Sequence, residues 1–159
     1  EHLFNRDYAN KTILLYYTGI TRLAKNILQE IVRGIFLNSP FHLEIIAKIG
    51  SNAQRARDAI QRCDQPALIE VIRASWQLNQ QLDSGTNPPE VQRILDRIDD
   101  WMAAAKLLGA GGGGFLLLFA KDEIAAGRIR KELTSQPPNA RARFVDFSVS
   151  DTGLQLTRS

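Results

Sequence analysis

The sequence contains few of the residues from which disulfides and metal sites are built. Cys63 is the only cysteine among 159 residues, which excludes a disulfide within the chain and is compatible with a reducing compartment. The two histidines are His2 and His42, and neither stands in a cluster with carboxylates or with Cys63. We therefore predict no metal site made of protein side chains.

Long apolar runs and strong charge are missing as well. No apolar stretch approaches the roughly 18 residues that a membrane span requires, and no charged segment followed by an apolar one opens the chain. The net charge is +3, and basic residues are interleaved with acidic ones along the chain, so no face is marked out for a phosphate backbone. We expect neither a membrane nor a nucleic acid as a partner, and a cytoplasmic location.

The apolar content suffices for one ordinary core. Hydrophobic residues make up 44% of the chain and charged residues 23%, as is typical of globular proteins. The length fits a single domain spanning residues 1–159. Because the first residue is Glu1 rather than methionine, we expect the chain to be a piece of a longer protein.

Periodicity in the first half predicts one strand followed by three helices. A β-branched and aromatic run predicts a strand at 13–17, and a helix capped by Thr21 should end near 38–40 with Leu23, Ile27, Ile31 and Ile35 inward. The second helix is predicted at 42–62 with an inward face of Leu43, Ile46, Ile49, Ala53, Ala56 and Ile60. The third is predicted at 66–82 with Leu68, Val71, Ser75, Leu78 and Leu82 inward.

The second half adds one more long helix and the rest of a sheet. Gly85 and two prolines make 83–89 a loop, and a fourth helix should follow with Val91, Leu95, Ile98 and Met102 in register. After a glycine-rich segment we expect a strand at 115–120, a helix at 122–133 and a closing hairpin of 144–149 with 154–156. This order predicts an α+β domain whose small, mainly antiparallel sheet is backed by a helical bundle.

The glycine-rich segment carries the clearest chemical signal. An ordered glycine costs roughly 0.5–1 kcal/mol relative to alanine, so five of them in six residues require a reason. One interpretation is an anion cradle, in which positive φ angles bring successive N–H groups together around a phosphate. The other is a structural turn between the apolar segments 103–108 and 115–120. The candidate loop consists of Gly109, Ala110, Gly111, Gly112, Gly113 and Gly114.

Two common nucleotide motifs do not fit this segment. It matches G-x-G-x-x-G letter for letter, but that dinucleotide fingerprint follows a strand and opens a helix. Here we expect a helix before the glycines and a strand after them. A Walker A loop is excluded because Phe115 stands where Gly-Lys-Ser/Thr would complete the motif.

Cations near the glycines are secondary candidates. Lys106 precedes the loop and could place a point charge on a phosphate, or it could be a surface lysine whose stem covers apolar neighbours. Arg22 and Lys25 follow Thr18 and Gly19, where backbone and cations could meet a ligand, although solvation or a structural ion pair also explains them.

The remaining polar candidates are acidic or hydroxyl residues. Asp83 and Ser84 lie in a proline-rich loop that could face a cleft, and the alternative is that they cap the next helix. Asp99 and Asp100 are adjacent on the expected helix and point about 100° apart, so they do not form a carboxylate pair and we assign them to a solvated face.

Several of these segments resemble one family. Lys106-Leu-Leu-Gly-Ala-Gly-Gly-Gly-Gly-Phe-Leu116 resembles the third, C-terminal motif of the GHMP kinases, and the resemblance extends over nearly the whole chain. Leu15-Tyr-Tyr-Thr-Gly-Ile-Thr-Arg22, the 83–89 loop and Arg141-Ala-Arg-Phe144 are similar to the C-terminal part of the family's bacterial bifunctional L-fucokinase/GDP-fucose pyrophosphorylase branch. Heptose-phosphate kinases share the Tyr-Thr-Gly-x-x-Arg element. Leu108 replaces a threonine that many members carry before Gly-Ala-Gly, which removes a hydroxyl but leaves the loop intact.

The resemblance implies the fold of a GHMP kinase C-terminal domain and a part in ATP-dependent phosphorylation of a sugar at its anomeric hydroxyl. In such kinases the glycine loop closes against the phosphate loop of an N-terminal domain, with ATP and Mg²⁺ as cofactors of the complete enzyme. Neither the family's Pro-x-x-x-Gly-Leu-Gly-Ser-Ser loop nor its catalytic carboxylate is found here.

We therefore expect no catalytic residue in this chain and no kinase activity from it alone. The expected partners are the N-terminal kinase domain in cis, the sugar substrate, and a second copy through the face that the missing domain would cover. A non-catalytic, ligand-binding α+β module is the alternative.

Overall fold

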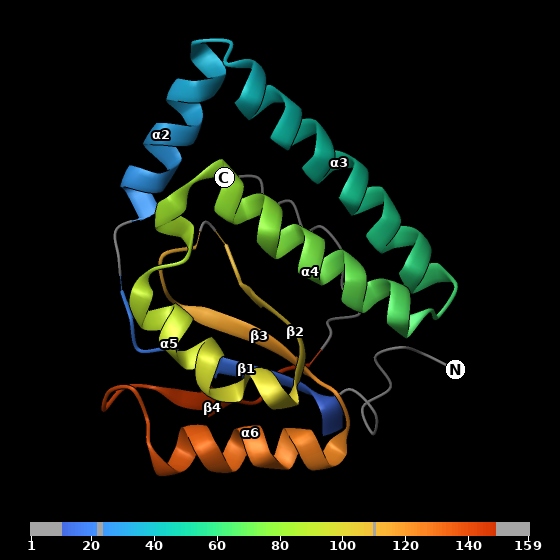
Figure 1. The fold of residues 1–159 in the computed structure, drawn as a ribbon, viewed down its shortest axis with the longest axis vertical. Helices are drawn as coiled ribbons and strands as arrows, with labels where there is room; N and C mark the ends of the chain where they lie inside the picture. Colours follow the sequence, from blue (N-terminus) through green and yellow to red (C-terminus); the bar gives the residue numbers. More distant parts are fainter. Residues whose placement is uncertain (1–10, 22–23, 110, 149–159) are drawn as a thin grey trace, which may run out of the picture.

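A four-stranded antiparallel sheet organises the chain. The structure, a computed structural model, describes residues 11–21, 24–109 and 111–148. The sheet has the order β2-β3-β1-β4 (Figure 1), with β1 at Ile13–Tyr17, β2 at Met102–Leu107, β3 at Phe115–Ala120 and β4 at Arg143–Val145. The helices are α2 (Ala24–Phe36), α3 (Pro40–Gln61), α4 (Gln65–Leu82), α5 (Pro89–Ile98) and α6 (Glu123–Ser135). The predicted α+β class is confirmed.

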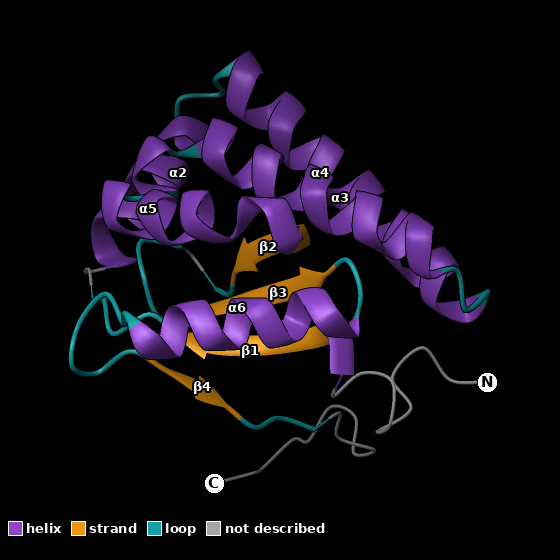
Figure 2. Cartoon of the chain, turned by 60° about the horizontal axis from the view of Figure 1, so that its bottom comes forward, coloured by secondary structure: helices purple, strands orange, loops and turns teal. Residues whose placement is uncertain are grey.

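Helices cover both faces of this sheet. On one face α5 and α6 pack on alternate strand residues, including Leu14, Tyr16 and Leu118, to form the main core. On the other face Ala59 of α3 and Leu68 of α4 contact Ile13, Ala104 and Phe119. Figure 2 shows α6 on one side of the sheet and the α3–α4 pair on the other. The strand alternation therefore divides the apolar residues between two helical layers.

Local sequence signals fix most helix starts. The side chain of Asp64 accepts a hydrogen bond from the Ala67 amide at the start of α4, and Asp122 accepts one from the Ala125 amide at the start of α6. Proline occupies the first or second position of α3, α4 and α5, where its missing N–H has no cost. These helices begin within about two residues of where they were expected.

The fourth helix is shorter than expected, which is the main correction to the predicted fold. It ends at Ile98, a short 3₁₀ turn spans Asp99–Trp101, and β2 follows. The glycines therefore connect two antiparallel strands instead of a helix and a strand. Pairing with β3 overrides the helical preference of the three alanines, because it places Ala105 and Leu107 in the main core.

Strand β2 is an edge of the sheet, and its outer side is partly occupied. Its register with β3 shifts between Met102 and Ala104. Beside this irregularity the Arg73 side chain of α4 donates from Nε to the Ala103 carbonyl oxygen at 2.6 Å. One backbone acceptor of the edge is thus taken by a side chain.

The inward face of α3 also differs from the prediction. Ile45, Asn52 and Ala59 are its buried residues, whereas Leu43 and Ile60 are 42% and 43% exposed. The face is rotated because apolar residues at 45, 46 and 49 permit two neighbouring stripes, and the contact with α4 selects one. The buried stripe repeats every seven residues, as in closely packed helix pairs.

Helix α2 is confirmed as an element, but part of its expected core face is exposed. Ile35 is 40% exposed and Phe36 is 83% exposed. The side chains of Leu23 and Ile27, the strand expected at 154–156 and residues 22–23 of the expected helix lie outside the described residues.

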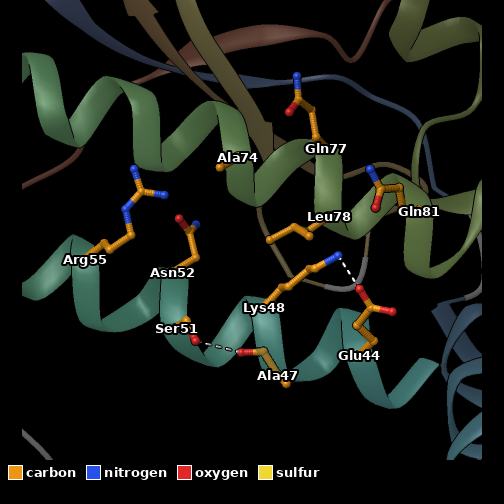
Figure 3. A pocket seen from close by; sticks show the side chains of 10 residues that line it. All are labelled: Glu44, Ala47, Lys48, Ser51, Asn52, Arg55, Ala74, Gln77, Leu78 and Gln81. Atoms are coloured by element: carbon orange, nitrogen blue, oxygen red, sulfur yellow. Dashed lines mark hydrogen bonds and ion pairs between the residues drawn. The ribbon is translucent and has the colours of Figure 1, made fainter. Parts of the chain in front are cut away.

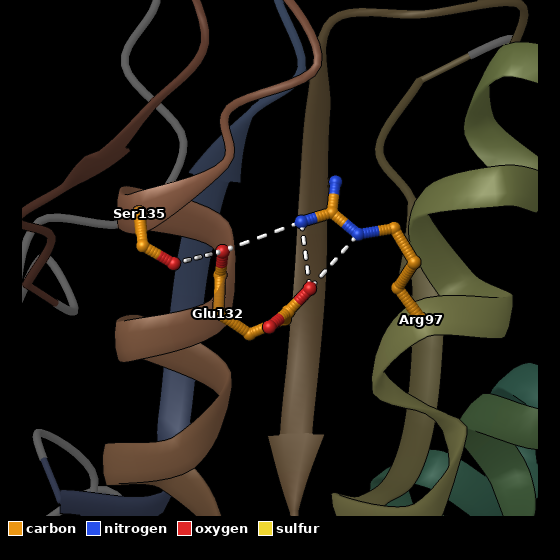
Figure 4. Close-up of polar contacts among 3 residues, drawn as sticks. All are labelled: Arg97, Glu132 and Ser135. Carbon is orange, nitrogen blue, oxygen red and sulfur yellow. Dashed lines mark hydrogen bonds and ion pairs between the residues drawn. The ribbon is translucent and has the colours of Figure 1, made fainter.

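An ion pair joins α5 to α6 on the main-core side of the sheet. Arg97 donates from Nε and Nη2 to Oε1 of Glu132 at 3.0 and 2.8 Å, and from Nη2 to the Glu132 carbonyl at 3.3 Å. Ser135 also donates to that carbonyl (Figure 4). Both charged side chains are 30% exposed, so the pair is better shielded from water than an ordinary surface pair.

Candidate functional site

Three loops meet where the glycine-rich segment, residues 109–114, connects β2 to β3. The amide and the hydroxyl of Thr18, just after β1, both donate to the Gly114 carbonyl at 2.9 Å. In return the Gly114 amide donates to the Ile20 carbonyl at 3.0 Å. On the other side the Gly112 amide donates to the Thr86 carbonyl at 2.8 Å. This glycine loop is therefore held between the 18–20 and 84–88 segments.

Close approach and backbone conformation both require glycine here. The described glycines of the loop all have positive φ, from 78° at Gly112 to 151° at Gly113, a region that residues with a Cβ rarely enter. A Cβ on Gly111 would stand 2.7 Å from Cγ2 and 2.8 Å from Cα of Thr86, and one on Gly113 would overlap the Ile20 carbonyl. The glycine content is thus explained in part by packing, as the structural interpretation held.

Packing does not occupy the whole loop, however. The amides of Gly109, Gly111 and Gly113 make no hydrogen bond with any residue that the structure describes, whereas those of Gly112 and Gly114 do. Gly109 is exposed, and Gly111, Gly113 and Gly114 are half-buried. Amides that are fixed by hydrogen bonds to the protein therefore alternate with amides that are available to a ligand. Successive backbone N–H groups with positive φ form the type of concave site that accepts anionic oxygens.

The structure brings two of the secondary candidates to this corner. Thr18 is fully buried and engaged with Gly114. Asp83 accepts a hydrogen bond from the Gly85 amide at 2.7 Å and caps the short 3₁₀ turn Ser84–Thr86, which supports the Thr86 carbonyl. Ser84 is exposed on that turn. Arg22 and Ala110 lie outside the described residues, as do the side-chain contacts of Lys25.

Lys106 lies beneath α4 rather than on the surface. Its Nζ donates to Ser75 Oγ at 2.7 Å, and it reaches Asn79 Oδ1 at 2.8 Å when that amide is oriented with its oxygen toward Nζ. Burial lowers the pKa of Lys106. The ammonium group thus connects β2 to α4 at the base of the glycine loop. Contact of Lys106 with a phosphate stays a prediction, and its bonds to α4 do not favour it.

Sequence reasoning missed the residues that shape this corner from a distance. Thr86 is 2% exposed and closes over Gly111. Asn139 donates from Nδ2 to the Thr18 carbonyl at 2.8 Å, and its Oδ1 accepts from the amides of Arg141 and Ala142. The one available signal was their position within turn-forming segments, Gly-Thr-Asn-Pro-Pro and Pro-Pro-Asn, which indicates a loop but not its partner.

An aromatic pair borders the loop on the sheet. Tyr17 and Phe115 have ring centroids 5.2 Å apart, and the Arg143 guanidinium lies 5.2 Å from the Tyr17 centroid. Asp99 and Asp100 are exposed on the 3₁₀ turn. In the part of the chain that is described, no three His, Cys, Asp or Glu side chains gather as a metal site, and no helix has the length and apolarity needed to cross a membrane.

The fold is shared with a known kinase family. The family model described as "GHMP kinases C terminal" matches residues 56–139. The chain belongs to this family. It is also similar to solved structures of the family: the mevalonate kinase of L. major in complex with R-mevalonate superposes with a TM-score of 0.68 at 21% identity, over 84% of this chain and 41% of that one.

Among named relatives the similarity to a fucose enzyme is pronounced. The chain is 49% identical over all its 159 residues to the L-fucokinase/L-fucose-1-P guanylyltransferase of Bacteroides fragilis, of which it spans 17%. It is 33% identical over 146 residues, 91% of its length, to the D-glycero-alpha-D-manno-heptose 7-phosphate kinase of Campylobacter jejuni, of which it spans 41%. The chain thus corresponds to a minor part of each relative, as expected for one domain of a larger kinase.

Proposed function

We propose that this chain is the C-terminal domain of an ATP-dependent sugar 1-kinase that converts L-fucose and ATP to L-fucose 1-phosphate. The proposal includes an N-terminal ATP-binding domain in cis, a cytoplasmic location and a role in GDP-fucose salvage. The observation that carries it is the glycine loop, with three amides that no described residue engages, in a chain 49% identical throughout to an L-fucokinase/L-fucose-1-P guanylyltransferase.

The loop suits phosphoryl transfer because that reaction depends mainly on positioning and on stabilising charge. Gly112 and Gly114 are fixed through Thr86 and Ile20, so the amides of Gly109, Gly111 and Gly113 would meet phosphate or sugar oxygens without reorganising. ATP would supply the transferred phosphoryl group. We assign no residue of this chain to Mg²⁺, since the described residues hold no cluster of carboxylates for it.

A substitution at Gly109 in the full-length enzyme tests this role. A Cβ there meets no atom within 4 Å, so alanine adds a methyl group at the open side of the loop without overlapping the core, while its φ of 80° also strains the loop backbone. We expect kcat/KM for L-fucose to fall about tenfold or more, because a displacement of about 1 Å at a reacting centre can cost about a hundredfold. Gly50→Ala, on the exposed side of α3 and also without close neighbours, is the control for a methyl group added away from the loop.

Substrate preference separates the two kinase assignments. The full-length enzyme should phosphorylate L-fucose in preference to D-glycero-D-manno-heptose 7-phosphate, and residues 1–159 alone should turn over neither. Preference for the heptose phosphate would favour the second relative. A Gly109→Ala enzyme with unchanged kinetics would favour the non-catalytic ligand-binding module, in which the glycines serve packing alone.

A further inference from the structure

A row of four side chains crosses the whole sheet beside the glycine loop. Tyr17 of β1 pairs with Phe115 of β3 on one side and with Arg143 of β4 on the other. The Leu108 amide, just after β2, donates to the Phe115 carbonyl at 2.9 Å. These residues therefore form one line, the terminal row, in the order Leu108, Phe115, Tyr17 and Arg143. Three spacings between strands make this row about 14 Å wide.

Burial on this face of the sheet decreases stepwise toward the terminal row. Because alternate residues of a strand share a face, the row belongs to the face that α3 and α4 cover. At the far end of that face Ile13 and Phe119 are buried. The half-buried residues of the middle row are Leu15, Lys106, Leu117 and Val145. In the terminal row Tyr17 is half-buried, and Phe115 and Leu108 are 40% and 41% exposed, so the helical layer ends short of it.

The terminal row has the composition of a protein interface. The rings of Tyr17 and Phe115 adjoin each other, and the Arg143 guanidinium lies 5.2 Å from the Tyr17 centroid. Aromatic residues and arginine are enriched in interface centres, and Arg143 makes no ion pair with a described residue. The groove of about 460 Å³ between α3 and α4 differs, because Figure 3 shows mainly polar and charged side chains, with Lys48 paired to Glu44.

The terminal row adjoins the open amides of the glycine loop. Leu108 and Phe115 directly precede and follow that loop, and Thr18, next to Tyr17, holds Gly114 through two hydrogen bonds. A group that brings a phosphate to the open amides must therefore approach beside this row. The chain spans 41% of the heptose-phosphate kinase and 41% of the mevalonate kinase structure, so more than half of each of these kinases lies outside the matched part.

We propose that the terminal row is the surface on which the N-terminal kinase domain docks in cis. The inference rests on the proposed function, which includes that domain. Leu108 and the two rings form the apolar centre of the contact, and the Arg143 guanidinium donates to a carboxylate or carbonyl group of the docked domain. Docking covers the open end of the sheet and holds the ATP-binding domain against the glycine loop.

Hydroxyl-radical footprinting of the full-length protein, read by mass spectrometry, tests whether the row is covered. The oxidation rate of each residue in the native protein is divided by its rate in the urea-unfolded protein, which cancels differences in intrinsic reactivity. We expect this ratio to be at least fivefold lower for Leu108 and Phe115 than for Ile124, a 71% exposed residue of α6 on the other side of the sheet. Their exposure in this domain alone predicts less than a twofold difference.

Photo-crosslinking identifies what covers the row. Replacement of Phe115 by p-benzoylphenylalanine in the full-length protein should give a product of unchanged molecular mass, crosslinked to a peptide of the domain that carries the ATP-binding phosphate loop. The same replacement at Ile124 is the control and should give no crosslink to that domain. The footprint of the parent protein requires no substitution, so it decides the question of coverage even if the Phe115 replacement prevents folding.

Three results would overturn the inference: ratios for Leu108 and Phe115 within twofold of that for Ile124, protection that disappears on dilution, or a crosslink from position 115 to a second copy or to another domain. Kinase activity toward L-fucose, measured on the same preparations, keeps the two proposals separate. An active enzyme with an uncovered row defeats this inference alone. A row crosslinked to the ATP-binding domain in an enzyme that does not phosphorylate L-fucose defeats the proposed substrate alone.

Discussion

Replacing Gly111 by alanine should destabilise the domain, because the added Cβ both clashes with Thr86 and requires a backbone conformation that favours glycine. The new Cβ would stand 2.7–2.8 Å from three atoms of Thr86, two of them backbone. Thr86 cannot withdraw easily, because it is 2% exposed and its carbonyl is bonded to the Gly112 amide. Relief therefore requires the loop and the 84–88 segment to separate.

The expected magnitude combines three contributions. A left-handed backbone conformation costs a residue with a Cβ about 1–2 kcal/mol, and overpacking costs about 1–3 kcal/mol. The reduced freedom of the unfolded chain returns about 0.4–1 kcal/mol. The net loss in the free energy of unfolding should thus be about 1–5 kcal/mol. Gly127→Ala, on the exposed side of α6 with no neighbour within 4 Å, should instead stabilise by about 0.5–1 kcal/mol.

Urea unfolding of the two variants beside the parent chain, followed by circular dichroism, measures both effects. Gly111→Ala should lower the free energy of unfolding and Gly127→Ala should raise it, and neither substitution should change the m-value. If Gly111→Ala unfolded at the urea concentration of the parent, the loop would not be clamped against Thr86. The account of why this segment is glycine-rich would then fail.

Three further predictions concern other polar groups. Tyr16→Phe should change the free energy of unfolding by less than about 1 kcal/mol, because the Tyr16 hydroxyl is buried without a described partner. Burial raises the Tyr16 pKa above 10.0, so the parent should lose stability relative to this variant above pH 10. Equal stability of the two proteins across alkaline pH would refute this. Glu132→Gln should lower the free energy of unfolding in urea by about 1–2 kcal/mol, because it weakens the half-buried hydrogen bond between the charged Glu132 and Arg97 side chains. An unchanged unfolding midpoint would contradict this prediction. Burial lowers the pKa of Lys106 from 10.5, so the unfolded chain binds more protons than the folded one. The stability of the parent relative to Lys106→Met should therefore rise as pH approaches 10.5. A fall in this stability difference with rising pH would refute the prediction.

The sequence sufficed for elements whose signals are local. The helices predicted at 66–82 and 122–133 are present, and Asp64 and Asp122 cap them. The apolar run at 115–120 forms β3. It did not suffice for β2, because three alanines before Lys106 favour a helix locally and become a strand through pairing with β3. The polar Lys106 between Ala105 and Leu107 was the available sign of strand alternation, and one polar residue is a weak signal in so short a run.

In the candidate site, too, local features could be predicted from the sequence and contacts between distant segments could not. The glycine run is evident in the sequence. Its contact residues Thr86 and Ile20, however, lie far from it along the chain and are brought to it only by the tertiary structure. The burial of Asn52 between α3 and α4 could not have been anticipated, because the register of α3 against α4 decides whether this residue is buried or exposed. Such choices depend on contacts between elements rather than on periodicity within one.

The arginine that reaches the outer side of β2 has a consequence for the behaviour of the chain at high concentration. An exposed, regular strand edge offers a template on which another polypeptide can add a strand, the first step toward fibrous aggregates. Here the Ala103 oxygen is already bonded to Arg73, and the neighbouring register is irregular, so an incoming strand finds no uninterrupted ladder. Removing that guanidinium should open this border of the sheet to unwanted partners while leaving the glycine loop unchanged.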